Sequence, residues 1–162
     1  MDILEIILKR RSVRAYQDKE IPDADLNKIL ESARMAPTSF NSQNFKIVAI
    51  RNPATIVRLA ALSRSPFISK APLILAIFNV NLENKYAPLD AAIVADHIMI
   101  SAWSLEVGSV FIGAYHNDEI RKFLSAPDTA EMIALMPLGY PADKEIPKKR
   151  KSLDELISYE KF

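Results

Sequence analysis

The feature that most constrains the fold is a long apolar segment in the second half of the chain, residues 89–108. Between Leu89 and Trp103 the polar residues are few: Asp90, Asp96, His97 and Ser101. A helix that is apolar nearly all round must be covered on all sides, and one sheet in a chain of 162 residues covers only one of its faces. We therefore expect a homodimer, with this helix at or near the interface. Gly108 is the expected C-cap of the helix.

Strands are expected on either side of this helix. The run Pro72–Val80 is almost continuously apolar, which is typical of a central strand buried on both faces. Three further segments have the composition of strands: Phe45–Ile50, Ser109–Tyr115 and Glu131–Tyr140. Helices are expected over five other segments: Asp2–Leu8, from Asp23 as N-cap up to Pro37, Ala54–Leu62 after Asn52, Asn117–Leu124, and a last one that begins with the capping-box pattern Ser152–Glu155. Strands separated by helices indicate a helix–sheet–helix layering in a single domain, residues 1–162. The tail through Phe162 is a candidate for an added strand at a sheet edge, of this copy or of its partner.

The composition argues against several classes of protein. The formal net charge is only +1, whereas proteins that bind nucleic acid usually carry a broad basic face. Cysteine is absent, which excludes disulfides, thiolate metal sites and cysteine nucleophiles and suits a reducing compartment. Asp2 and Glu5 argue against a secretory signal, and no apolar run reaches the length of a membrane span. We therefore expect a cytoplasmic protein without nucleic-acid or membrane partners.

Two short basic clusters lie far apart in the sequence. Arg10–Arg14 places three arginines and Ser12 directly after the first expected helix, and the second cluster is Lys148–Lys151. Arginine presents a planar fork of donors that suits phosphate oxygens, and serine adds a compact donor. The two clusters could converge on one ligand phosphate; the alternative is that each is a solvated charged turn. The three glycines cannot compose the Gly-rich turn of a dinucleotide fold or a P-loop. Side chains must therefore supply many of the hydrogen bonds to any bound phosphate.

A second unusual stretch is the loop Pro37–Asn44, which is dense in hydroxyl and amide side chains. One interpretation is a polar surface turn. The other is a set of neutral hydrogen-bond partners for a heteroaromatic ring. Its position in the sequence does not choose between the two. Gly139 ends an expected strand, at a point where the backbone could approach a ligand closely.

The side chains of most hydrolase and transferase mechanisms are missing. His97 and His116 are the only histidines and lack metal-ligand spacing, so no metal site is expected. We interpret His97 beside Asp96 as a satisfied buried polar pair or a dimer contact. There is no G-x-S-x-G nucleophile elbow. When side chains cannot do the chemistry a bound cofactor can, and we predict no catalytic side chain.

Four features in one order make the chain resemble the FMN-dependent nitroreductases. They are Arg10–Arg14 after a short opening helix; Ala36–Gln43, similar to the family's A-P-S-x-x-N-x-Q loop; Asp90–Gly113, with its long apolar helix; and Pro137–Pro141 leading into Lys148–Arg150. Together they span nearly the whole chain.

The resemblance implies an α+β fold, a three-layer helix–sheet–helix sandwich of the nitroreductase type, in an intertwined homodimer with two FMN sites at its interface. One subunit would hold the phosphate and neighbouring polar atoms with a set of strap and tail residues: Arg10, Ser12, Arg14, Lys148 and Arg150, with Arg11 inside the same motif. The other subunit would bring a set of loop residues onto the isoalloxazine ring: Pro37, Thr38, Ser39 and Asn41, with Gln43 nearby. Leu138 and Gly139 would line the opposite edge of the ring through backbone contacts.

The resemblance also implies an enzyme, an NAD(P)H-dependent FMN oxidoreductase. NADH or NADPH would pass a hydride to N5 of FMN and leave, and a small oxidised acceptor such as a nitroaromatic or quinone would then take the electrons, in a ping-pong cycle. Arg14 is the candidate for stabilising the reduced ring. Two alternatives stay open: a specialised flavin-dependent oxidase or dehalogenase, and a non-catalytic flavin-binding or redox-sensing module.

Overall fold

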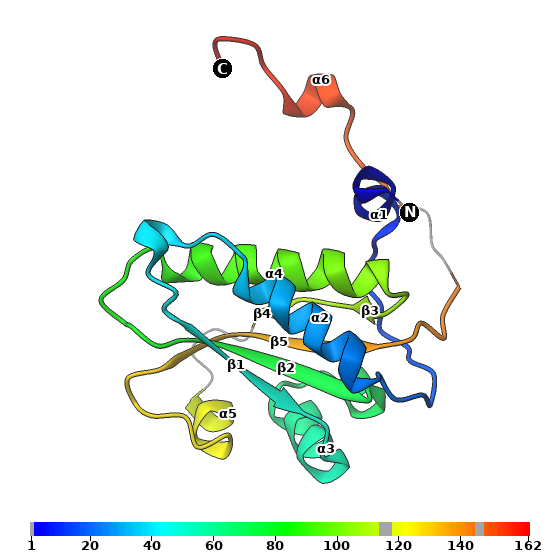
Figure 1. Ribbon diagram of the computed structural model, residues 1–162, viewed down its shortest axis with the longest axis vertical. Helices are drawn as coiled ribbons and strands as arrows, with labels where there is room; N and C mark the ends of the chain where they lie inside the picture. The colour runs from blue at the N-terminus through cyan, green and yellow to red at the C-terminus, as the bar shows by residue number, and fades with distance from the viewer. Residues whose placement is uncertain (1, 114–117, 145–147) are drawn as a thin grey trace.

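The computed structural model of the chain describes residues 2–113, 118–144 and 148–162, which form three layers (Figure 1). One face of a central sheet is covered by α2 (Asp23–Arg34) and α4 (Ala87–Ser104). The other face is covered by α3 (Pro53–Leu62) and α5 (Asp118–Phe123). The expected helix–sheet–helix layering is therefore confirmed. Within the described ranges, no helix is both long and apolar enough to cross a membrane.

The sheet is antiparallel, and its strands follow the order β1-β2-β5-β3. These are β1 (Phe45–Ile50), β2 (Leu73–Asn79), β5 (Glu131–Gly139) and the short β3 (Gly108–Ser109), while β4 (Ile112–Gly113) also pairs with β5. Every residue of β2 is buried, as its unbroken apolar sequence predicted. A strand with neighbours on both edges and helices on both faces has no solvated side, so an alternating polar pattern is absent.

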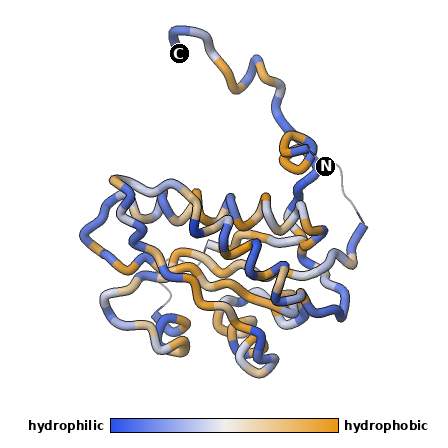
Figure 2. The backbone as a smooth tube through the Cα atoms, in the orientation of Figure 1, coloured by the Kyte–Doolittle hydropathy of each residue, from blue (hydrophilic) through white to orange (hydrophobic). Residues whose placement is uncertain are grey.

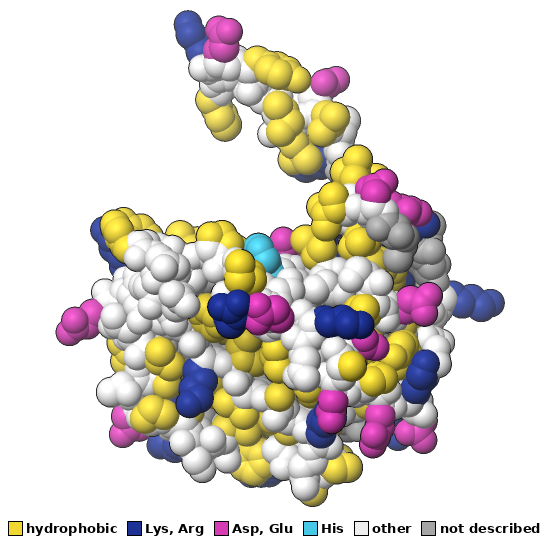
Figure 3. Space-filling model, in the orientation of Figure 1, with side chains coloured by type: hydrophobic (Ala, Val, Ile, Leu, Met, Phe, Trp, Pro, Cys, Tyr) yellow, Lys and Arg dark blue, Asp and Glu magenta, His cyan; other side chains and the backbone are white. Residues whose placement is uncertain are grey.

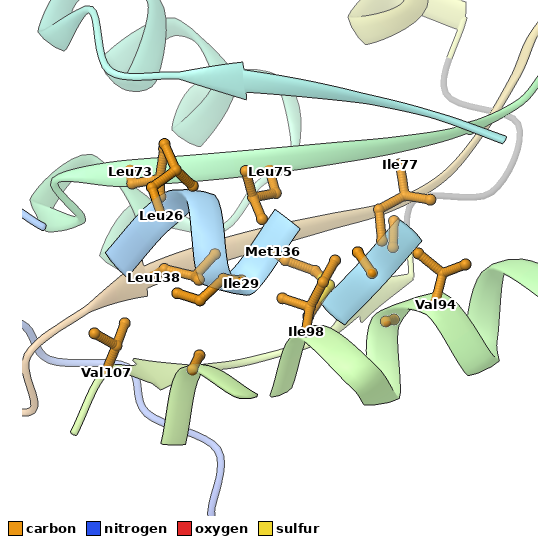
Figure 4. Close-up of a cluster of buried hydrophobic side chains, with 14 of the residues drawn as sticks. Leu26, Ile29, Leu73, Leu75, Ile77, Val94, Ile98, Val107, Met136 and Leu138 are labelled. Atoms are coloured by element: carbon orange, nitrogen blue, oxygen red, sulfur yellow. The ribbon is translucent and has the colours of Figure 1, made fainter. Parts of the chain in front are cut away.

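Two cores form because successive side chains of β2 point to opposite faces. Leu73, Leu75 and Ile77 pack against α2 and α4 (Figure 4). Ile74, Ala76 and Phe78 pack against α3 and α5 on the other face. Figure 2 shows the resulting apolar centre of the sandwich, with the polar stretches concentrated in its loops and turns.

The end of α4 differs from the expectation. The C-cap is Leu105, and Glu106 takes the left-handed backbone conformation with φ of 62°. Gly108 begins β3 instead, and a Cβ at this position would lie 2.4 Å from Cγ2 of Val13. Close packing of Val13 against the backbone therefore explains this glycine.

Several other boundaries also shift. Pro22 occupies the N-cap position of α2, and the expected cap Asp23 lies in the first turn, paired with Arg51. The expected strand Ser109–Tyr115 is divided between β3 and β4. Its last residues, together with His116 and Asn117, lie outside the described residues. Two short 3₁₀ turns lie outside the expected helices and strands: η1 (Ser39–Asn41), within the polar loop, and η2 (Pro66–Lys70), before β2.

Two short helices stand away from the sandwich on the side of α4 (Figure 1): α1 (Ile3–Lys9) and α6 (Leu153–Leu156). Figure 3 shows yellow, apolar groups on the parts of the chain outside the main body. The exposed apolar residues of the two helices and of the tail after α6 are Ile3, Leu4, Ile7, Leu8, Leu153, Leu156, Ile157, Tyr159 and Phe162. The expected added strand does not form within residues 157–162 of the single chain. On α4 itself, Leu89 and Ile93 are exposed on the side away from the sheet.

Candidate functional site

Residues 10–17, which we call the strap, lead from α1 along the edge of the sheet. The Val13 N–H donates to the Ser109 carbonyl at 3.0 Å, and the Gln17 N–H donates to the Tyr140 carbonyl at 2.9 Å. The strap is therefore tied both to β3 and to the chain just after β5.

Burial alternates over residues 11–14 of the strap, as it does along an extended chain. Val13 is fully buried, whereas Ser12 and Arg14 on either side of it are exposed. This alternation puts Ser12 and Arg14 on one side of the strap and Arg11 and Val13 on the other. The five residues of the motif are thus not equivalent.

The two basic clusters meet at one pocket of about 510 Å³. Its lining comes from the strap and from the segment that follows β5: Arg10, Arg11, Ser12, Arg14, Asp143, Lys148 and Arg150. All but Asp143 are residues that the sequence singled out for a phosphate site. Among the described lining residues, five cationic side chains face one carboxylate, an excess of positive charge that attracts anions.

The partners of the cations differ. Lys148 Nζ donates to the Leu8 carbonyl at 2.7 Å, in the last turn of α1. Arg10 Nη1 lies 4.0 Å from Sδ of Met99 on α4, a weak contact. Within the described part of the chain, no carboxylate forms an ion pair with the guanidinium group of Arg10, Arg14 or Arg150. These three guanidinium groups hold most of the pocket's uncompensated charge.

Arg11 is held differently. Its Nη2 donates to the backbone carbonyl of Asp143 at 3.1 Å and to Oδ1 of the same residue at 2.7 Å. The guanidinium lies 6.0 Å from the ring centroid of Trp103 on α4, and the side chain is only 10% exposed. The Arg11 guanidinium lowers the pKa of the Asp143 carboxyl below its usual value, chiefly through the hydrogen bond.

Sequence reasoning missed Asp143. The available signal was its place in the sequence: Asp143 lies in the short linker between the expected strand Glu131–Tyr140 and the basic cluster Lys148–Lys151. The other basic cluster, Arg10–Arg14, was expected to converge on the same place. Such a residue is well placed to pair with one of the cations.

The polar loop 37–43 is pinned to the beginning of α4. The Ser39 N–H and Oγ both donate to Oδ1 of the buried Asp90, at 2.9 and 2.7 Å. Thr38 Oγ1 accepts the Gln43 N–H at 3.0 Å. Phe40, Asn41 and Gln43 have φ of 54°, 53° and 49°, a left-handed conformation that Asn tolerates and that is strained for Phe. The loop therefore has a defined shape, and strain of this kind is common where loops serve a ligand.

One chain does not bring the loop and the pocket together. The loop contacts Asp90 in the first turn of α4, and Arg11 lies on Trp103 in the last turn. At 1.5 Å per residue these two positions are about 20 Å apart along the helix. Figure 1 shows the same separation, with η1 and α1 at opposite ends of α4.

Leu138 and Gly139 lie inside β5 and do not line the pocket. Leu138 is fully buried, and Gly139 pairs with Gly108 of β3. A Cβ at Gly139 would lie 2.8 Å from both Pro72 Cδ and Tyr16 Cδ1. The structure thus gives a packing reason for this glycine, and the close approach of a ligand stays a prediction.

The histidine interpretation needs correction. His97 Nδ1 lies 3.0 Å from the Ile93 carbonyl of its own helix, and Asp96 is exposed, so the two are not a buried pair. His97 as a dimer contact stays a prediction. Within the described ranges, no group of three or more His, Cys, Asp or Glu side chains could hold a metal ion.

Comparison with known proteins identifies the family. The model of the Nitroreductase family matches residues 7–72 and 60–140. The chain belongs to the nitroreductase family. A relative in Methanothermobacter thermautotrophicus, named for NADH dehydrogenase and NAD(P)H nitroreductase, is 30% identical over 151 residues, covering 88% of this chain and 79% of the relative. An NADH dehydrogenase of Thermus thermophilus is 27% identical over 197 residues, covering 97% and 95%.

Solved structures of the family have the same fold. An FMN-dependent nitroreductase from Clostridium difficile R20291 superposes with a TM-score of 0.92 at 25% identity, covering 98% of this chain and 99% of that one. The resemblance and the α+β sandwich that it implies are therefore confirmed. In this nitroreductase-family chain the predicted strap and tail residues line one pocket, near the end of α4. The predicted loop residues lie at the beginning of α4, about 20 Å away along the helix.

Proposed function

We propose that this nitroreductase-family chain is an FMN-dependent NAD(P)H oxidoreductase that works as a homodimer with two FMN sites at its interface. The observation that carries the proposal is the convergence of the strap and the C-terminal basic cluster on one anion-attracting pocket. The names of the relatives, which mention NADH and NAD(P)H, and the FMN-dependent structure support the choice of cofactor and donor.

The donors in the pocket fit a phosphate monoester. Arg10, Lys148 and Arg150 supply cationic N–H donors, and Ser12 supplies a hydroxyl that lines the same pocket. Bonds of this kind between a charged donor and an anionic acceptor are the strong ones in proteins. A pocket of about 510 Å³ is larger than a phosphate, which leaves room for the neighbouring polar atoms of the cofactor.

The ring would be held by the other subunit. In a two-fold dimer the same patch of each copy meets at the axis, so copies packed through α4 in opposite directions bring the loop of one to the pocket of the other. The exposed apolar side chains of α1, α4 and the tail supply surface for such an interface. Pro37, Thr38, Ser39, Asn41 and Gln43 would then offer neutral partners to the isoalloxazine ring. Leu138 and Gly139 stay a prediction for the opposite edge of the ring.

When bound, FMN supplies the redox chemistry, taking hydride from NADH or NADPH and passing electrons to a small acceptor such as a nitroaromatic or quinone in a ping-pong cycle. The residues of the chain orient the cofactor and shape the charge around it. Arg14, which is exposed beside the pocket, would place positive charge near the ring. No side chain has to act as general acid or base, and we propose no catalytic residue.

The test is direct. The purified protein should be yellow or should take up added FMN, and anaerobic NADH or NADPH should bleach it. Arg10→Ala and Arg150→Ala should each weaken FMN binding by about tenfold or more, the loss expected for a charged hydrogen bond. Arg58→Ala is the matched control, since Arg58 is exposed on α3 in the opposite layer.

Other outcomes have definite meanings. A yellow protein that neither nucleotide bleaches would indicate a flavin-binding or redox-sensing module instead of a reductase. Equal FMN retention in all three arginine variants would contradict the phosphate assignment. Protein that never binds FMN would refute the proposal.

A further inference from the structure

Arg11 is set apart from the other cations of the pocket. It lies on the inward side of the strap with the buried Val13, and its side chain is 10% exposed. Lysines and arginines are seldom buried to this extent without a partner, because a desolvated charge is costly. The partner of Arg11 is Asp143, at 2.7 Å.

This ion pair joins two separate parts of the chain at the edge of the pocket. Arg11 belongs to the strap, and Asp143 belongs to the turn after β5, five residues before Lys148. Backbone hydrogen bonds already tie these parts together, from Ala142 N–H to the Ala15 carbonyl at 2.9 Å. The Arg11–Asp143 pair adds the contact nearest the pocket.

Three contacts fix the orientation of the Arg11 guanidinium. Nη2 of Arg11 donates to both the carboxylate and the backbone carbonyl of Asp143. Trp103 lies against the guanidinium and adds a cation–π contact. An arginine held in this way keeps one orientation, and the Nη2 donors are used within the protein.

We propose that Asp143 is a positioning residue of the anion pocket. It holds Arg11 against Trp103, so that Arg11 braces the pocket wall rather than serving as a principal phosphate ligand. It also fixes the start of the segment that brings Lys148 and Arg150 to the strap. The inference rests on the proposed function, because FMN is the anion through which it is tested.

A positioning role and a purely electrostatic role of Asp143 predict opposite changes in phosphate affinity when its charge is removed. Among the described residues, Asp143 is the one carboxylate that lines the pocket. If it acted only through its charge, removing that charge would strengthen the binding of a phosphate. If it positions the cations, removing it weakens phosphate binding even though the pocket becomes more positive.

The experiment compares FMN with riboflavin, which lacks the phosphate, by titration into purified apoprotein. For Asp143→Asn we expect FMN affinity to fall by about tenfold or more, in line with the loss of an orienting partner at other ligand sites. Riboflavin affinity should change less than about twofold, and Asp143→Glu should recover part of the FMN affinity.

The matched control is Asp128→Asn. Asp128 pairs at 2.6 Å with Arg121, another arginine side chain that is 10% exposed, and it lies before β5, whereas Asp143 lies after it. This control tests the effect of losing a similar ion pair far from the pocket, and it should leave FMN affinity unchanged. Should Asp143→Asn fail to fold, Arg11→Lys tests the same pair, because lysine keeps the charge and loses the planar fork.

Equal or tighter FMN binding by Asp143→Asn would overturn the inference, and so would parallel losses for FMN and riboflavin, which would indicate a general structural role. These results leave the proposed function intact, since the wild-type protein would still bind FMN. Wild-type protein that binds no FMN would overturn both.

Discussion

The backbone N–H and the hydroxyl of Ser39 donate to one and the same carboxylate oxygen of Asp90, at 2.9 and 2.7 Å. The other oxygen, Oδ2, is buried and has no hydrogen-bond partner among the described residues. A buried carboxylate is costly to keep, and here it orders the polar loop at the beginning of α4. The position of the proposed ring-binding loop thus depends on a residue of α4.

Replacing Asp90 should therefore loosen the loop and destabilise the fold. Asp90→Ala removes the acceptor of two partly buried donors, and we expect the free energy of unfolding to fall by about 1–3 kcal/mol. Urea denaturation measures the change. Asp96→Ala, an exposed residue of the same helix, should change stability little; equal losses for the two variants would mean that the Ser39–Asp90 contact is unimportant.

Gly108 should not tolerate a side chain, for a reason of space. A Cβ would lie 2.4 Å from Cγ2 and 2.8 Å from Cβ of Val13, so Gly108→Ala should displace the strap and lower the free energy of unfolding by about 1–3 kcal/mol. FMN binding should weaken as well, because the strap carries Arg10 and Ser12. Thermal denaturation and FMN titration measure the two effects.

A second substitution, at Val13, tests whether a clash with this side chain causes the destabilisation by Gly108→Ala. Val13→Ala removes the methyl groups that the new Cβ would meet, so it should recover part of the stability when added to Gly108→Ala. On a wild-type background Val13→Ala should be destabilising, since Val13 is fully buried. Simple addition of the two losses would contradict the steric explanation.

The Arg11–Asp143 pair should make stability sensitive to acid. The Arg11 guanidinium lowers the pKa of Asp143 below its usual 3.8 in the folded protein. A carboxyl group whose pKa is lower in the folded than in the unfolded protein contributes its full stabilisation at pH values above the unfolded-state pKa. This stabilisation is lost as the pH falls through the folded-state pKa. The stability difference between wild type and Asp143→Asn should thus be constant above about pH 5 and shrink below about pH 4.

Urea denaturation at several pH values measures that difference. Glu5→Gln is the control, because Glu5 also has a lowered pKa from Lys9 but both partners of this pair lie at the surface, with side chains 41% and 56% exposed. Solvent and salt screen such a pair, so it should contribute little at any pH. A difference for Asp143→Asn that does not change down to pH 3 would contradict the assigned pair.

Much of the fold could be predicted because local patterns carry it. The unbroken apolar run of β2 has no alternation, and burial on both faces is the arrangement that explains it. At the end of α4 the local signal misled: Gly108 looks like a helix C-cap, yet its reason is the side chain of Val13, far away in the sequence. A close approach between distant segments leaves no periodic pattern to recognise.

In the candidate site, too, some features could be predicted from local sequence and others depend on contacts between distant segments. Charge and hydrogen-bonding chemistry pointed to Arg10, Lys148 and Arg150, and the structure brings them to one pocket. Arg10 and Arg11 have different partners, the sulfur of Met99 and the carboxylate of Asp143. These partners depend on the tertiary contacts of the strap with α4 and with the turn after β5. Neighbours in a motif can thus have different partners that only the three-dimensional structure distinguishes.

The central claim is that each FMN site takes its cations from one subunit and its loop from the other. Complementation tests it: a variant with Arg10→Ala and Arg150→Ala is mixed, under conditions that exchange subunits, with a variant carrying Thr38→Ala and Asn41→Ala. Each homodimer should bind FMN poorly at both sites. The mixed dimer contains one site with both halves intact, so we predict recovery of one tightly bound FMN per mixed dimer. If each site belonged to a single chain, the mixed dimer would have no intact site, and the absence of any recovery would contradict the account.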